Sequence, residues 1–136
     1  MHRFMLQIET NGNNDVVNLS PDLAARLRDV IGIGVVNVFV VGSTAGVTTL
    51  EYEPGLVKYD VPAALQRLVP DDARYEHEAT WNDDNGHSHV RAALIGPSLT
   101  VPYAQGRLLT GEYQQVVLME FDTQPRKRTI ICSALP

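Results

Sequence analysis

The chain has 136 residues, a formal net charge of -5 at pH 7 and 44% hydrophobic residues. This length provides for one hydrophobic core, so we expect a single domain over residues 1–136. The composition excludes global disorder, and the negative charge argues against a nucleic-acid-binding domain. The most apolar stretch, Val35 to Val41, is too short to span a bilayer. One cysteine, Cys132, allows no intrachain disulfide, so we expect a buried thiol in a cytoplasmic protein.

The first elements of the chain are predicted from turn and capping residues. Arg3 to Glu9 is typical of an opening strand, and Asn11-Gly12 predicts a hairpin between this run and the next one. A helix follows, with Ser20 as its cap and Pro21 in its first position. Gly32 ends this helix.

β-Branched residues dominate the centre of the chain. Val35 to Val41 predicts an interior strand, the Gly42–Gly46 bend interrupts it, and Val47 to Tyr52 predicts the next strand. Asp60 to Val69 predicts a second helix. The remaining strand-like runs are His87 to Ile95, Leu99 to Tyr103, Glu112 to Phe121 and Lys127 to Ala134. The sequence therefore predicts an α+β domain with two helices and a mostly antiparallel sheet or β-sandwich.

Histidines gather in one short stretch of the sequence. On a strand, residues two apart share a face, so His87, His89 and Arg91 are expected to project together. Two imidazoles on one face can hold a metal, and His77 would complete a three-histidine shell. The alternative is a solvated strand face with two unrelated histidines.

Four carboxylates near these histidines in the sequence could serve as ligand, base or magnesium anchor: Glu51, Asp60, Asp83 and Asp84. Each has a structural alternative. Asp60 can serve only as a helix cap, and Asp83 to Gly86 only as a turn.

Phosphate could be bound at the Gly42–Gly46 bend. Ser43 and Thr44 supply hydroxyls there, and the bend supplies backbone N–H groups. Arg126 or Arg128 could add a guanidinium, which matches phosphate in a bidentate geometry. The bend lacks the lysine of a Walker loop, and the arginines can equally be a solvated strand entry.

Four blocks of the sequence resemble the signature of the YjbQ family, in order and spacing, from about Arg3 to Leu135. They are Tyr75-Glu76-His77, Asp84 to Val90, Gly106-Arg107-Leu108 with Gly111 to Gln114, and Glu120-Phe121-Asp122 with Pro125 to Arg128. The chain departs from the family pattern in three places: Gly42-Ser43 stands for His-Thr, Leu50 for Asn, and Tyr113 for Trp.

The resemblance implies a β-sandwich with helices, assembled as a homotrimer with sites near subunit boundaries. It implies a secondary thiamine-phosphate synthase activity, which joins hydroxymethylpyrimidine diphosphate to thiazole phosphate and releases diphosphate. The partner would be a small phosphorylated molecule, with no nucleic acid and no membrane. The alternative is a metal-binding trimer of unknown ligand with weak, altered or no activity.

Site residues follow from the resemblance together with the patterns above. The metal, zinc or magnesium, would be held by His77, His87 and His89. Phosphate would be bound by Ser43, Thr44 and Arg128. Catalysis and ligand orientation would depend on Glu51, Asp60, Asn85 and Arg91.

Overall fold

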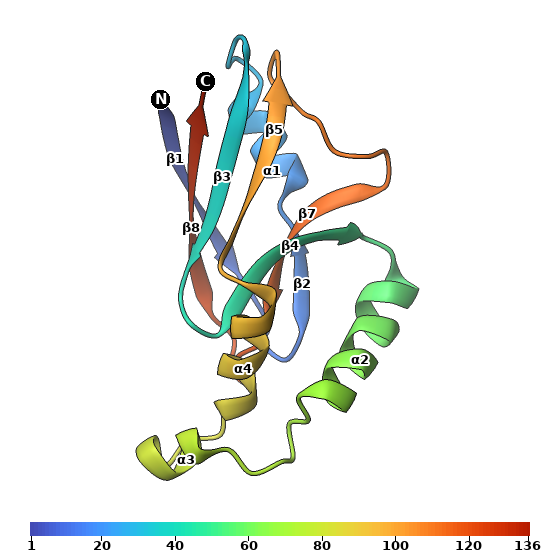
Figure 1. The fold of residues 1–136 in the computed structure, drawn as a ribbon, viewed down its shortest axis with the longest axis vertical. Helices are drawn as coiled ribbons and strands as arrows, with labels where there is room; N and C mark the ends of the chain where they lie inside the picture. The colour runs from blue at the N-terminus through green and yellow to red at the C-terminus, as the bar shows by residue number, and fades with distance from the viewer.

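Eight strands form two antiparallel sheets, in a computed structural model that describes all residues, 1–136 (Figure 1). The five-stranded sheet has the order β1 (His2–Glu9), β8 (Lys127–Leu135), β3 (Ile33–Val41), β5 (Ser98–Ala104), β6 (Arg107–Leu108). The three-stranded sheet has the order β2 (Asp15–Asn18), β7 (Gln114–Glu120), β4 (Ala45–Glu51). The chain ends lie side by side, with His2 opposite Ala134. The predicted mostly antiparallel β-sandwich is confirmed.

The strand β7 is buried on both faces, and its alternating side chains separate two hydrophobic clusters. Val116 and Leu118 belong to the cluster that the two sheets enclose. Val117 and Met119 belong to a second cluster, which α2 and α4 cover from the other side. The fold therefore has three layers: the large sheet, the small sheet, and helices.

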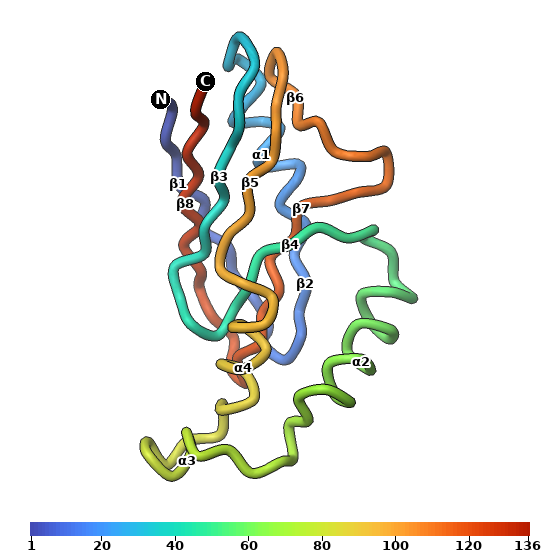
Figure 2. Tube along the Cα trace, in the orientation of Figure 1, coloured from blue at the N-terminus to red at the C-terminus, as the bar shows by residue number.

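Five helical segments accompany the sheets: α1 (Ser20–Leu27), the π-helix η1 (Leu56–Asp60), α2 (Val61–Leu68), α3 (Glu76–Trp81) and α4 (Gly86–Ile95). Figure 2 follows the chain along α2, away from the sheets, through α3, and back through α4 to β5. None of these helices has both the length and the apolar character needed to cross a membrane. The prediction of two helices was wrong, because α3 and α4 were not foreseen.

The predicted strand from His87 to Ile95 is the helix α4. Its alternating start resembles a strand, but Arg91 to Leu94 (Arg-Ala-Ala-Leu) consists of strong helix formers. At its start, the carboxylate of Glu78 accepts the Gly86 N–H, and at its end Gly96 has a φ of 95° before Pro97. Helix propensity and these two ends outweigh the alternation.

Three smaller predictions were also wrong. Asn11-Gly12 forms no hairpin, because β1 pairs with β8 whereas β2 pairs with β7 in the other sheet. Ser20 does not cap α1; its hydroxyl accepts the Val116 N–H and ties the helix to β7. Asp60 makes no cap hydrogen bond, because the chain is already helical through η1.

Candidate functional site

The helix α4 sends its three predicted site residues in different directions. Residues two apart on an α-helix point about 200° apart, whereas residues four apart share a face. His87 and Arg91 accordingly lie on the buried side, with 6% and 3% exposure. His89 points elsewhere and lines a cavity. The prediction that all three share one face was wrong, since it assumed a strand.

His77 from α3 and His89 from α4 form a pair of imidazoles. Their ring centroids are 4.4 Å apart, with 52° between the planes. The Nε2 atom of His77 lies 3.2 Å from the Asp83 carboxylate and 3.1 Å from the Asn85 amide. The sequence foresaw a role for His77, His89 and Asn85, and the structure brings these three together.

The amide of Asn85 can serve His77 in either protonation state. With its nitrogen turned toward His77, it donates to Nε2 at 3.1 Å and to Asp83 at 3.1 and 3.3 Å. In the other orientation its nitrogen donates to Asp122 at 3.4 Å and its oxygen faces Nε2. A neutral His77 therefore finds a donor, and a protonated His77 finds the Asp83 carboxylate and an amide oxygen.

A cavity of about 280 Å³ lies between α4 and the bend that joins β3 to β4. It is lined by Gly42, Ser43, Ala45, His89, Ala92, Ala93 and Pro97. Among these lining residues, His89 contributes the titratable side chain and Ser43 contributes a hydroxyl group. The predicted phosphate bend and one histidine of the predicted cluster thus share one cavity.

Below the bend, buried polar groups form a connected network. The Thr44 hydroxyl donates to Asp122 at 2.9 Å and accepts from Arg128 Nη2 at 2.7 Å. Arg128 also donates to Glu120 through Nε and Nη2, at 2.8 and 2.5 Å. Two of the three guanidinium nitrogens of Arg128, Nε and Nη2, therefore have protein acceptors. The third, Nη1, has none.

Arg128 Nη1 lies directly against the backbone of Gly42. A Cβ atom on Gly42 would lie 2.6 Å from Arg128 Nη1. Because glycine has no Cβ, the guanidinium can approach the backbone of the bend at this point. Gly42 also lines the cavity, so Arg128 is next to its wall.

Asp122 is the residue that joins this network to the histidines, and the sequence reasoning did not select it. Burial opposes its ionisation, but hydrogen bonds from Thr44 and the Thr123 N–H, with the nearby charge of Arg126, lower the pKa of Asp122. Arg126 binds its carboxylate at 2.9 and 3.0 Å. An acid two residues after the end of a buried strand is the signal that could have identified it.

Arg91 and His87 support the fold beneath the cavity wall. Arg91 donates twice to the Val69 carbonyl, at 3.1 and 2.8 Å, and once each to Gln66 and Asn14. His87 lies beside Tyr75, and its Nδ1 has no hydrogen-bond partner. Burial lowers the pKa of His87.

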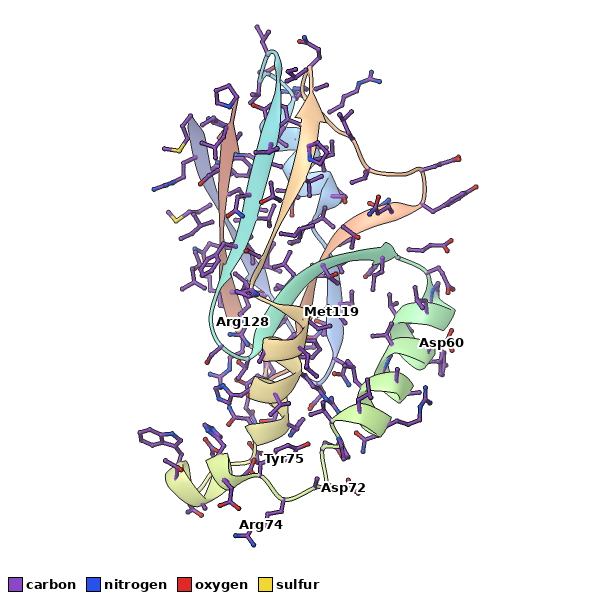
Figure 3. The ribbon with its side chains drawn as sticks, viewed as in Figure 1. Asp60, Asp72, Arg74, Tyr75, Met119 and Arg128 are labelled. Atoms are coloured by element: carbon purple, nitrogen blue, oxygen red, sulfur yellow. The ribbon has the colours of Figure 1, made fainter.

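Glu51 and Asp60 lie away from the imidazole pair. Glu51 ends β4, six residues from Ala45 at the cavity, which is about 20 Å along a strand. Figure 3 places Asp60 beside α2, well away from Arg128 near the bend. The chain therefore does not bring these two carboxylates into the site with Asn85.

The predicted three-histidine metal shell is not formed within the chain. No three His, Cys, Asp or Glu side chains are grouped so as to hold a metal ion. His77 and His89 are adjacent, but α4 turns His87 into the interior beside Tyr75. The residues present do not fit the implied cation.

Comparisons with known proteins identify the fold family. A family model described as UPF0047 protein YjbQ-like matches residues 4–136. The chain belongs to the YjbQ family. A UPF0047 protein of Methanothermobacter thermautotrophicus is 40% identical over 126 residues, 92% of this chain and 85% of that protein. The UPF0047 protein YjbQ of Escherichia coli O157:H7 is 31% identical, covering 85% of this chain and 84% of that protein.

Solved structures of similar proteins share the whole fold. A hypothetical protein from Aeropyrum pernix K1 has a TM-score of 0.89 and 29% identity, covering 99% of this chain and 98% of that one. A conserved hypothetical protein from Thermus thermophilus has a TM-score of 0.83 and 30% identity, covering 97% and 99%. The names of these YjbQ relatives give no reaction.

Proposed function

We propose that this YjbQ-family chain is a transferase of the secondary thiamine-phosphate synthase type. In this reaction the thiazole nitrogen attacks the methylene carbon of hydroxymethylpyrimidine diphosphate, and the carbon–oxygen bond to diphosphate breaks. The observation that carries the proposal is the imidazole pair, His77 and His89, at a cavity bounded by the Ser43 bend.

The departing diphosphate needs positive charge and a proton. An imidazole can hold or release a proton near neutral pH, so His89 in the cavity wall is the proposed general acid. His77, whose Nε2 contacts Asp83 and Asn85, would pass to His89 a proton taken up from water after diphosphate has left. Arg128 Nη1, behind Gly42, would stabilise the developing anion.

The proposed partner of the chain is a small phosphorylated molecule, and the proposed assembly is a homotrimer. The cavity of about 280 Å³ is small for two substrates together.

The outer face of β3 exposes Ile33, Val35, Phe39 and Val41, at 74%, 37%, 40% and 48%. These apolar side chains, interrupted on the same face by Asn37, are the surface on which the proposed trimer would assemble. We place the protein in the cytoplasm.

The test is an assay of the purified protein with both substrates, with thiamine phosphate detected by mass spectrometry. His89→Ala is expected to lower the rate at least ~100-fold, a typical effect of losing a general acid. His2→Ala is the matched control, because His2 is an exposed histidine on β1. Absence of product with the unaltered chain, or equal rates for both variants, would contradict the proposal.

A further inference from the structure

A second cavity, of about 400 Å³, lies between the β1–β2 loop and the helical segment η1–α2. Its polar wall includes Asn11, Asn14, Asp15, Tyr52 and Lys58. It shares no lining residue with the cavity at His89. Its volume is within the range of small-molecule sites.

The side chain of Asn14 is held in place by a buried cation. Arg91, 3% exposed, donates through Nη1 to the Asn14 amide oxygen at 3.0 Å. The loop backbone adds to this, because Asn14 has a φ of 67° and its N–H donates to the Glu120 carbonyl. With its oxygen fixed, the amide nitrogen of Asn14 has a set position and no protein acceptor.

The other polar groups of this wall are also oriented. The Tyr52 hydroxyl donates to the Val16 carbonyl at 3.1 Å, which fixes a ring that is 46% exposed. One oxygen of Asp15 accepts the Asn11 N–H at 2.9 Å, and the other remains free. Lys58 comes from the π-helix η1 and forms no ion pair. Such π-helical turns are frequent at functional sites.

We propose that this cavity binds a sugar phosphate of about the size of ribose 5-phosphate. A carboxylate oxygen such as that of Asp15 suits sugar hydroxyls, as in dinucleotide-binding sites. The Asn14 amide donates to a further oxygen of the sugar, and the Tyr52 ring covers its apolar face. Lys58 supplies the point charge for the phosphate. The site is independent of the proposed transferase reaction.

The test is a titration of the full chain with ribose 5-phosphate, followed by NMR amide shifts and calorimetry. Shifts are expected in residues 11–16 and in the Asn14 side-chain amide. Lys58→Met is expected to weaken binding at least ~10-fold, which is the effect of losing one charge-assisted hydrogen bond. Lys127→Met is the matched control, because it removes the same charge at the start of β8. His89→Ala should leave the affinity unchanged.

Three outcomes would overturn the assignment. They are shifts centred on the His89 cavity, equal weakening by Lys58→Met and Lys127→Met, and no binding of ribose 5-phosphate at millimolar concentration. Ribose and inorganic phosphate, tested separately, are each expected to bind more weakly than the joined molecule. Equal affinity for inorganic phosphate alone would be a fourth such outcome, because it contradicts recognition of the sugar.

Discussion

Glu120 is the residue whose replacement should most weaken the fold. It is fully buried and accepts four hydrogen bonds: from Arg128 Nε at 2.8 Å and Nη2 at 2.5 Å, from the Thr10 hydroxyl at 2.7 Å and from the Asp122 N–H at 3.1 Å. Each carboxylate oxygen takes two of these donors. In Glu120→Gln, an amide nitrogen replaces one oxygen and faces an Arg128 N–H in either orientation, because Nε and Nη2 bind different oxygens of Glu120.

The substitution also leaves the Arg128 charge buried without its counterion. Removing one partner of such a pair costs about 3–5 kcal/mol of the free energy of unfolding. Urea denaturation followed by far-ultraviolet circular dichroism measures this loss, with the slope of the transition as a check on two-state behaviour. A loss within about 1 kcal/mol, the level of an exposed ion pair, would refute the reasoning.

A double variant distinguishes the cost of leaving Arg128 as an unpaired buried charge from the cost of losing the ion pair itself. Glu120→Leu with Arg128→Met replaces both charges by apolar side chains of similar size. This change is expected to cost less than Glu120→Gln, because no unpaired charge remains in the interior. A double variant that unfolds more easily than the single one would show that the four hydrogen bonds, and not the unpaired charge, dominate.

Three further predictions follow from buried groups. Gly42→Ala should destabilise the fold by about 1–3 kcal/mol, because the added Cβ displaces Arg128 Nη1; urea denaturation measures this, and an unchanged midpoint would contradict it. Because burial lowers the pKa of His87, the folded state favours its neutral form, so this contribution to stability is complete above the ordinary pKa of 6.5 and is lost as pH falls through the lower, folded-state pKa. Thermal unfolding between about pH 7.5 and 5 should show a decline that His87→Met reduces, and equal declines would count against it. Burial raises the pKa of Cys132 to about 11, so a disulfide reagent at about pH 8 should react only at the rate of unfolding, and rapid labelling of the folded chain would oppose this.

The strands were the most predictable part of the fold. Val35 to Val41 is dense in β-branched residues, and the structure extends this run to β3, Ile33–Val41. The first helix was predictable from Pro21 and the apolar spacing, although Leu19 and not Ser20 occupies the cap position. Local residue chemistry specified these elements because each has one dominant periodicity.

The candidate site was predictable only in part, because its geometry depends on the misassigned segment. His-x-His alternates like a strand, whereas α4 is held as a helix by the Glu78 carboxylate eight residues before Gly86 and by packing against β4. A helix separates His87 from His89 and brings His89 to His77. Glu51 and Asp60 were predicted as site residues because they are carboxylates near the histidines in the sequence. In the structure they lie away from the imidazole pair.

The helix α4 lines the cavity at the bend, and it touches the wall of the second cavity through the hydrogen bond from Arg91 to Asn14. His89 lines the cavity at the bend, while Arg91, on the buried side of the same helix, holds Asn14 in the wall of the second cavity. Because a helix moves as a rigid unit, a ligand that draws Asn14 toward itself pulls on Arg91 and thus on α4. The buried Val69 carbonyl, which accepts two hydrogen bonds from Arg91, resists that pull. The contacts of Arg91 with Val69 therefore keep α4 in place when the second cavity is occupied, which is why His89→Ala is expected to leave the affinity for ribose 5-phosphate unchanged.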